Sequence, residues 1–279
     1  MRGAKNLGGK AVLVTGGARG IGTQVVRQLI GHGARVAVVD RDGAAAQRLV
    51  AELGPPATAI EADVTSAESI AAACAIAAAH FGGLDVVVAN AGIAGPAATV
   101  AAVDPAQWRS VIDINLVGVF HTAAAALPHL RQRRGYLLAV ASIGAVIPGP
   151  TVSAYMAAKA GVESLTRSLR VELGGTGVGV GIAYFGLVDT GLAQQMLADS
   201  GVGAMMSGLP IFGEPIPADD AATAITSGIA RRSRRVCAPG WVRLLLDLRV
   251  PLMLTDRLLA RWPSMRRTVQ DADRVEAAG

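Results

Sequence analysis

Lys10-Ala-Val-Leu-Val-Thr-Gly-Gly-Ala-Arg-Gly-Ile-Gly22 decides the fold. The apolar run as far as Thr15 predicts a short buried β-strand, and the glycines that follow end it. Over 21–32, apolar side chains recur three and four residues apart, which predicts a helix with one buried face. A strand joined to a helix by a glycine-rich turn is a typical opening unit of a parallel sheet.

The same alternation of strand and helix continues along the chain. Further strand-like runs lie at 36–40, 57–60, 84–89, 136–141, 178–184 and 236–238, with helical segments such as 43–53 between them. This pattern predicts an α/β fold: a Rossmann-like, doubly wound parallel sheet of about seven strands flanked by helices. We expect one domain over 1–240, which includes a substrate loop at 190–217, and a basic amphipathic C-terminal extension over 241–279.

Composition describes a globular chain with a basic end. The sequence is 52% hydrophobic and 17% charged, and its 4% aromatic content argues against a nucleic-acid stacking surface. Residues 1–229 carry 15 Lys and Arg against 16 acids, whereas 230–279 carry 11 Arg against 5 acids. The positive charge therefore belongs to the tail, which suits an anionic lipid or acidic partner, or simply a solvated face.

The cysteines and the termini suggest a cytoplasmic protein. Cys74 and Cys237 lie far apart and in no metal-ligand spacing, so we expect no disulfide framework and no metal site. Each is expected to act as a small apolar residue. Residues 1–10 lack the apolar core of a secretory signal. The uncharged run 135–158 is long enough for a membrane span, but glycines and prolines interrupt it, which favours a soluble chain.

The glycine-rich turn predicts a dinucleotide-binding site. Gly16, Gly20 and Gly22 allow the backbone to turn sharply and to approach a pyrophosphate, whose charge would face the N-terminus of the following helix. The turn stands between a predicted strand and a predicted helix, which is the context that this motif requires.

Asp40, at the end of the second predicted strand, indicates which dinucleotide binds. A carboxylate there can accept hydrogen bonds from the ribose hydroxyls and repel a 2′-phosphate. Two like charges about 4 Å apart cost roughly 4 kcal/mol near a surface. Arg19 and Arg41 lie close enough in sequence to offset part of that cost. We therefore expect NAD, with NADP as the alternative.

Tyr155 and Lys159 form the predicted proton-transfer pair. Residues four apart share one face of a helix. A tyrosine with a pKa near 10 is a poor base at neutral pH, but a neighbouring ammonium and an oxidised nicotinamide would both lower that pKa. The chain contains 23 Arg and only three Lys, and Lys159 is the only lysine beyond residue 10. A compact ammonium can hydrogen-bond ribose hydroxyls where a guanidinium would not fit equivalently.

Together these residues resemble the short-chain dehydrogenase/reductase family in its common single-domain form, over roughly residues 8–240. The resemblance implies an NAD(P)-dependent oxidoreductase that interconverts an alcohol and a ketone, commonly as a homodimer or homotetramer. It implies that Tyr155 transfers the proton, that Ser142 orients the substrate oxygen and that Lys159 lowers the tyrosine pKa and holds the ribose. Asn115 matches the asparagine that holds a proton-relay water.

The resemblance also supplies further cofactor contacts. Asp63 and Val64 match the adenine-contacting pair, 90–92 matches the Asn-Ala-Gly motif after the fourth strand, and Val188 and Thr190 match contacts to the nicotinamide carboxamide. The full expected set is Gly16, Arg19, Gly20, Ile21, Gly22, Asp40, Arg41, Asp63, Val64, Asn90, Ala91, Gly92, Tyr155, Lys159, Val188 and Thr190. One departure is Phe185 before Gly186, where the family usually has proline. We expect a looser turn there and a phenyl ring that fills the substrate cleft.

Two apolar segments favour a hydrophobic substrate. The region 190–217 is rich in Gly, Met and Pro, which predicts either an adaptable lid or a helix pair packed permanently on the body. In the tail, one predicted helical face carries Trp241, Leu244, Leu245 and Leu248, and a second cluster contains Leu258, Leu259 and Trp262. Arginines flank both, so the tail suits packing on protein or peripheral contact with an anionic membrane.

Two other functions remain open. A nucleotide-sugar epimerase or dehydratase also uses a Tyr and a Lys, but usually has a larger C-terminal substrate domain. A non-catalytic dinucleotide-binding regulatory protein would be expected to have lost one of the catalytic residues.

Overall fold

The computed structural model describes residues 7–198 and 214–252, together with positions 261, 263, 266, 267, 269 and 270. Most of the predicted substrate loop and the second apolar cluster of the tail therefore lie outside the described residues.

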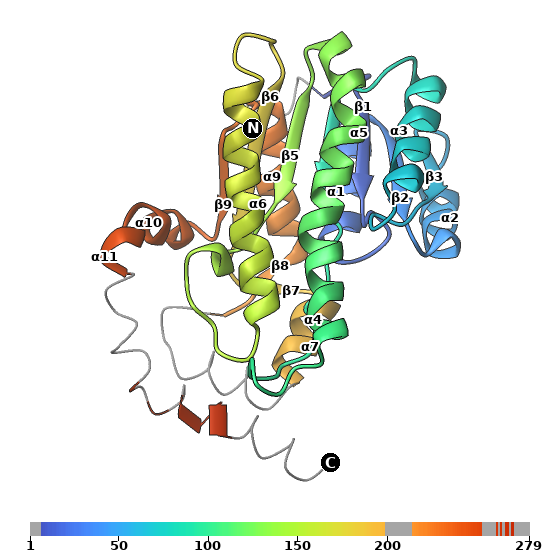
Figure 1. The fold of residues 1–279 in the computed structure, drawn as a ribbon. Coiled ribbons are helices and arrows are strands. Elements are labelled where there is room, and N and C mark those ends of the chain that lie inside the picture. Colours follow the sequence, from blue (N-terminus) through green and yellow to red (C-terminus); the bar gives the residue numbers. More distant parts are fainter. Residues whose placement is uncertain are drawn as a thin grey trace.

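A seven-stranded parallel sheet forms the centre of the molecule (Figure 1), in the order β3-β2-β1-β4-β5-β6-β9. Its strands are β1 Ala11–Thr15, β2 Arg35–Asp40, β3 Ala57–Glu61, β4 Val86–Ala89, β5 Tyr136–Val140, β6 Gly179–Phe185 and β9 Arg235–Ala238. The predicted sheet is confirmed. Its strand order reverses between β1 and β4, and such a switch point leaves a crevice at the carboxyl ends of the strands.

Helices cover both faces of the sheet. They are α1 Gly20–Gly31, α2 Gly43–Leu53, α3 Ala67–Phe81, α4 Pro105–Ile112, α5 Gly118–Arg133, α6 Ser153–Glu172 and α9 Ala218–Ala230. Along β1, Val12 and Val14 join the core beneath α1, α2 and α9, while Ala11 and Leu13 join the core beneath α3, α5 and α6. Because both faces are buried, the strands appear in the sequence as continuous apolar runs.

Pro105–Arg133 is one continuous helical stretch made of α4, a π-helix at Asp113–Val117 (η2) and α5. Among the described residues it alone is long and apolar enough to span a bilayer, by length and composition. It packs against α3, α6 and the strands β4 and β5, and Figure 1 shows α5 lying along the sheet. This packing accounts for its apolar composition.

A second, small sheet joins the two ends of the predicted substrate loop. β7, Val188–Asp189, pairs in parallel with β8, Ile216–Pro217, and α7, Gly191–Ala198, follows β7 directly. The residues between 198 and 214, which include most of the Met-rich part of the loop, are outside the described structure.

The predicted apolar face of the tail is wrong. In α10, Trp241–Asp247, the buried side chains are Val242, Leu245 and Leu246, whereas Leu244 and Leu248 are 59% and 46% exposed. Six of the eight residues from 241 to 248 are apolar, so periodicity could not choose between the two faces. A short helix, α11 (Arg249–Leu252), follows, and Figure 1 shows both helices beside β9 and α6.

Candidate active site

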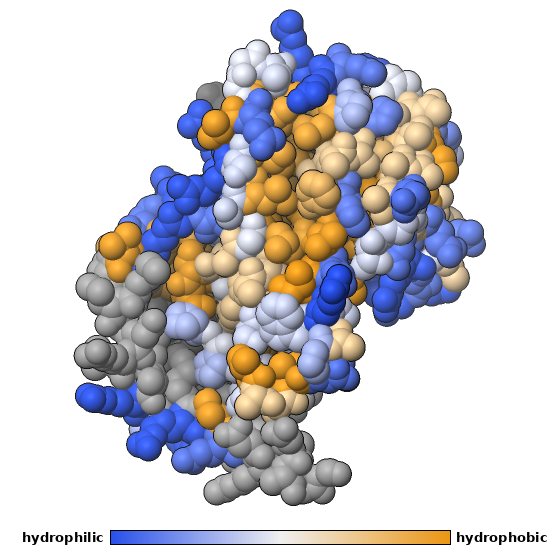
Figure 2. Space-filling view, in the orientation of Figure 1, coloured by the Kyte–Doolittle hydropathy of each residue, from blue (hydrophilic) through white to orange (hydrophobic). Residues whose placement is uncertain are grey.

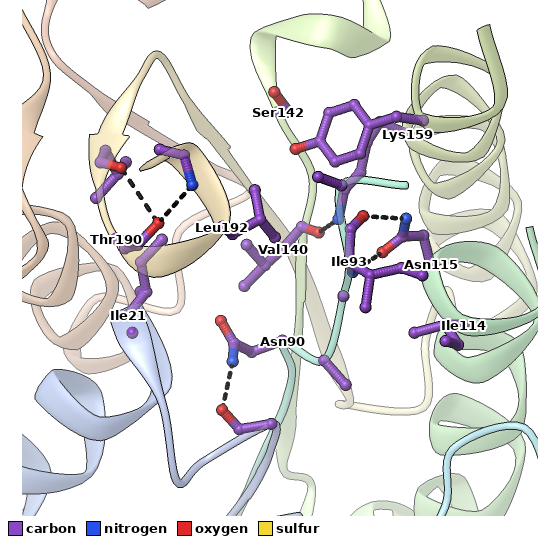
Figure 3. A pocket seen from close by; sticks show the side chains of 18 of the residues that line it. Ile21, Asn90, Ile93, Ile114, Asn115, Val140, Ser142, Lys159, Thr190 and Leu192 are labelled. Carbon is purple, nitrogen blue, oxygen red and sulfur yellow. Dashed lines mark hydrogen bonds between the residues drawn. The ribbon is translucent and has the colours of Figure 1, made fainter. Parts of the chain in front are cut away.

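A cavity of about 1100 Å³ runs along the carboxyl ends of the central strands. It collects side chains and backbone from the turns that follow β1, β2, β3, β4, β5 and β6. Every predicted site residue lines it except Gly22, which lies one residue further into α1. Figure 3 shows Ser142 and Lys159 on one side of this cavity, and Thr190 and Ile21 on the other.

The β1–α1 turn is held so that its backbone faces the cavity. Gly16 has φ +62°, and a Cβ there would lie 2.8 Å from Ala91 Cα, while a Cβ on Gly22 would lie 2.0 Å from the carbonyl oxygen of Gly16. The Asn90 amide donates to the carbonyl oxygens of Thr15 and Gly16 at 3.0 and 3.1 Å. Only glycine permits this close packing.

The N-terminus of α1 offers donors for an anion. No side chain caps this helix end, and no acidic residue lies in its first turn. The first backbone N–H groups of a helix have no partner within the helix, and together with the helix dipole they favour a negative charge. Thr190 lies beside this end, since a Cβ on Gly20 would be 3.5 Å from Thr190 Cγ2. A pyrophosphate fits the chemistry of this position.

Asp40 shapes the turn as well as facing the cavity. Its carboxylate accepts hydrogen bonds from the backbone N–H groups of Ala18 and Asp42, both at 3.1 Å. Arg19 forms its ion pair with Asp42 and not with Asp40. A backbone hydrogen bond from Ala45 and this ion pair both hold the pKa of Asp42 below its usual value. Arg19 was predicted to offset the charge of Asp40, but in the structure it offsets the charge of Asp42 instead.

The adenine-side residues lie at the end of β3. The Asp63 carboxylate accepts from the N–H and the hydroxyl of Thr65, both at 2.8 Å. The Val64 carbonyl oxygen lies 2.9 Å from Nδ1 of His121 on α5. His121 is a contact that the sequence did not indicate, because it comes from a helix more than fifty residues further along the chain.

The predicted proton-transfer pair lies at the start of α6. Tyr155 is the third residue of this helix, and Lys159 follows one turn later, with its Nζ 5.6 Å from the centre of the Tyr155 ring. Lys159 is 4% exposed and donates a hydrogen bond of 3.0 Å to the carbonyl oxygen of Val140. Ser142, just beyond β5, accepts from the N–H of Gly144 at 3.1 Å, and its hydroxyl is near enough to Tyr155 to act on the pKa of that residue.

The predicted lowering of the Tyr155 pKa is wrong for the protein alone. Burial raises the pKa of Tyr155, and the hydrogen bond with Ser142 acts in the opposite direction. Burial also lowers the pKa of Lys159 to about 8. Both groups are desolvated, so each is driven toward its neutral form. The positive charge of an oxidised nicotinamide is the remaining influence that would favour the phenolate.

Asn115 lies in the π-helix η2, fully buried, with its side chain occupied by Ile93. Its amide donates to the Ile93 carbonyl oxygen at 2.8 Å, and its oxygen accepts from the Ile93 N–H at 2.9 Å. A Cβ on Gly92 would lie 2.6 Å from the Asn115 oxygen and 3.6 Å from Lys159 Nζ. Asn115 is thus near Lys159, and its side chain fixes the segment after β4. The water relay stays a prediction.

Beyond the catalytic pair, the cavity wall is apolar. This part comes mainly from the segment after β5 and from α7, and its side chains include Ile143, Ile147, Val152, Met156, Leu187, Leu192 and Met196. The sequence indicated only the α7 part, by its Met-rich composition; nothing in the spacing of 143–152 distinguished a cavity wall from a core segment. Phe185 is 3% exposed and belongs to the core beneath α9, so it fills the core more than the cleft.

The cysteines and acidic residues show no further site in the described ranges. Cys74 and Cys237 are both free, and burial raises the pKa of the Cys74 thiol to about 11. Within the residues that the structure describes, no three His, Cys, Asp or Glu side chains gather as a metal site would need.

Comparison with known proteins identifies the family. Residues 10–201 match the family model described as short chain dehydrogenase. The chain belongs to the short-chain dehydrogenase/reductase family. It is therefore an NAD(P)-dependent oxidoreductase that acts on CH–OH groups, as the arrangement of its cavity residues suggested.

Two of the relatives are a dehydrogenase and a protein described as an inactive dehydrogenase. The chain is 41% identical to cis-4-hydroxycyclohexanecarboxylate dehydrogenase of Sinomonas cyclohexanicum, over 68% of this chain and 78% of that protein. It is 38% identical to the inactive 2-(S)-hydroxypropyl-CoM dehydrogenase 2 of Xanthobacter autotrophicus, over 62% of this chain and 76% of that protein. Among solved structures, 3-ketoacyl-(acyl-carrier-protein) reductase from Brucella melitensis, complexed with NADH, matches with a TM-score of 0.74 and 28% identity, over 83% of this chain and 97% of that one.

Proposed function

We propose that this dehydrogenase oxidises a neutral, hydrophobic secondary alcohol to a ketone with NAD⁺. The carrying observation is that one cavity joins Asp40 and the uncapped end of α1 to Ser142, Tyr155 and the buried Lys159. A dinucleotide bound across the strand ends from β2 toward β5 would bring its reactive ring to this group. Bound there, NAD⁺ would supply the hydride acceptor.

The chain's own residues handle the proton. Ser142 orients the alcohol oxygen. Tyr155, as phenolate, takes the proton from this oxygen while the hydride leaves the carbon that carries the oxygen. Lys159 places an ammonium next to the ring and offers donors to the ribose. Proton transfer from such a positioned group is typically worth about 10²–10⁴ in rate. Tyr155 is half-buried where it lines the cavity, so a bound substrate would cover its hydroxyl and keep water away from the transfer.

Asp40 supports the choice of NAD over NADP. Its carboxylate is fixed by two backbone hydrogen bonds, and Arg19 of the β1–α1 turn is paired with Asp42. A 2′-phosphate would therefore meet a fixed negative charge. We expect NAD⁺ to bind at least about tenfold tighter than NADP⁺, which corresponds to about 1.4 kcal/mol.

Calorimetry tests this preference. Asp40→Ala should lose the discrimination, whereas Asp113→Ala, which removes a carboxylate that does not line the cavity, should keep it. Tighter binding of NADP⁺ by the wild type would contradict the assignment and would point to a ketone reductase.

The apolar wall supports an uncharged substrate. Among the described residues, the charged side chains that line the cavity lie at the Asp40 end, apart from Lys159. Lys159 donates a hydrogen bond to the carbonyl oxygen of Val140. The undescribed segment 199–213 contains no Lys or Arg in its sequence. No described residue on this side of the cavity would pair with a substrate carboxylate, and burying a carboxylate without a partner is costly.

Substrate comparison tests this proposal. We expect cyclohexanol to have a kcat/KM at least about tenfold higher than that of cis-4-hydroxycyclohexanecarboxylate, because the unpaired charge costs more than about 1.4 kcal/mol. Faster turnover of the carboxylate would overturn the proposal.

An exposed apolar surface over α5 and α6 supports the expected homodimer or homotetramer. Phe120 is 51% and Val171 83% exposed there, and Figure 2 shows apolar surface across this face. Light scattering that gave a monomer would contradict this expectation. Membrane contact has no support in the described part of the tail, where α10 packs on the protein. Sedimentation with anionic liposomes tests that alternative, and cytoplasmic location stays a prediction.

A further inference from the structure

The C-terminal extension reaches the wall of the active site through Trp241. A Cβ on Gly186 would lie 3.0 Å from Trp241 Cζ2, 3.3 Å from Trp241 Cη2 and 3.3 Å from Pro239 Cδ. The edge of the indole ring therefore packs directly on the backbone that follows β6. Gly186 also binds the strand that leads to Trp241, since its N–H donates to the carbonyl oxygen of Ala238, the last residue of β9, at 3.0 Å.

The turn under the indole is part of the cavity. Gly186, Leu187 and Val188 line it, and β7 begins at Val188. A bound dinucleotide would have its adenosine at Asp40, after β2, and its pyrophosphate at α1, after β1. Its nicotinamide would then lie further along the strand order. That direction leads across β4 and β5 to β6, where this turn stands.

The helix that carries Trp241 is anchored at several points. Val242, Leu245 and Leu246 are buried in the core cluster that contains Ile182 and Tyr184 of β6. Two ion pairs add to this packing. Asp247 pairs with Arg235 of β9 at 2.8 Å, and Arg249 pairs with Glu163, which is 8% exposed.

Glu163 connects this anchor to the catalytic helix. It lies on α6, one turn beyond Lys159 and two turns beyond Tyr155. The segment 241–249 thus spans from the turn after β6 to the helix that holds the proton-transfer pair. By holding the turn after β6 and helix α6 at a fixed separation, this segment would set the width of the cavity at the end that contains Tyr155 and Lys159.

We propose that Trp241 is a positioning residue for the nicotinamide half of the cofactor, which it aligns by holding the 186–188 turn in place. The ring contact replaces the stiffness that a proline before Gly186 would give. This inference rests on the proposed dinucleotide binding at this cavity. Trp241 itself does not line the cavity, so its effect on the cofactor is transmitted through the backbone of the turn.

The test compares two ligands that differ only in the nicotinamide. Calorimetry with NAD⁺ and with ADP-ribose isolates the contribution of the nicotinamide ring, because both ligands carry the adenosine diphosphate and the second ribose. We expect Trp241→Ala to weaken NAD⁺ binding by about fivefold to tenfold. ADP-ribose binding should change by less than about twofold, because the Asp40 end keeps its contacts. Trp241→Phe should recover most of the NAD⁺ affinity.

Leu244→Ala is the matched control. Leu244 lies one turn further on the same helix and is 59% exposed, so its removal should leave both affinities unchanged. Equal losses for both ligands in Trp241→Ala would show general destabilisation and overturn the proposal, as would no loss at all. If the alanine variant does not fold, Trp241→Leu, which keeps an apolar side chain but no ring, must show the selective NAD⁺ loss. Wild-type protein that binds neither ligand would instead overturn the proposed function, and this inference with it.

Discussion

At the β1–β2 end of the cavity, backbone amides and a carboxylate form the wall; at the β5–β6 end, the wall is made of apolar side chains around Tyr155 and the buried Lys159. The first end is built by tight glycine turns, in which a single Cβ would strike backbone atoms. The second is built by side chains from the segment after β5, from α6 and from α7, and α10 supports it indirectly. Binding of the cofactor thus depends on backbone shape, whereas catalysis and substrate choice depend on side-chain chemistry and burial.

The largest effect should follow from a change at the catalytic end only. Tyr155→Phe removes the hydroxyl that exchanges the proton, so kcat should fall by about 10³-fold or more, while NAD⁺ affinity should stay within about twofold. Steady-state kinetics and calorimetry measure the two. Tyr136→Phe is the control, because this buried hydroxyl donates to the Ser233 carbonyl oxygen and lies away from the cavity. Retained activity in Tyr155→Phe would assign the proton to another group.

A change at the β1–β2 end should instead lower the affinity for NAD⁺. Gly22→Ala places a Cβ 2.0 Å from the Gly16 carbonyl oxygen, which is backbone and cannot move aside. We expect NAD⁺ affinity to fall by about 100-fold, or more than about 2.7 kcal/mol. Gly31→Ala, at the far end of the same helix, meets nothing within 4 Å and should stabilise the fold by about 0.5–1 kcal/mol. Unchanged affinity in Gly22→Ala would refute the role of this turn.

The last prediction concerns stability, and not cofactor affinity or turnover. Because burial lowers the pKa of Lys159 from 10.5 to about 8, the unfolded chain binds more protons than the folded one between these values. Its contribution to the free energy of unfolding should therefore rise with pH across this window, by up to about 3 kcal/mol. Lys159→Met should lack this rise and be about 1–3 kcal/mol more stable at pH 7, although inactive.

Urea unfolding at neutral and at alkaline pH measures this contribution. A wild-type protein whose difference from Lys159→Met did not change with pH would show that Lys159 is not desolvated in solution.

Much of the fold was predictable because local rules and burial agree. The strands are buried on both faces, so each appeared as an apolar run, and the glycine turn has a steric requirement that sequence alone expresses. The spacing of Tyr155 and Lys159 likewise follows from helix geometry. These features depend on residues close together in the chain.

The features that could not be predicted depend on distant residues. The buried face of α10 is chosen by its contact with β6 and by the Arg249–Glu163 ion pair, and not by its own pattern. Arg19 had carboxylates at both 40 and 42 within reach in sequence, and only the folded turn shows that it pairs with Asp42. The raised pKa of Tyr155 reflects burial by several elements.

The central claim is that this cavity carries out hydride transfer, and the most direct measurement is the formation of NADH by the wild-type protein from NAD⁺ and a set of neutral secondary alcohols. We predict NADH formation with at least one apolar cyclic alcohol, and none in Tyr155→Phe. If the protein binds NAD⁺ but gives no NADH from any alcohol, and oxidises no NADH or NADPH with the matching ketones, it is a dinucleotide-binding protein without this activity, and the account is contradicted.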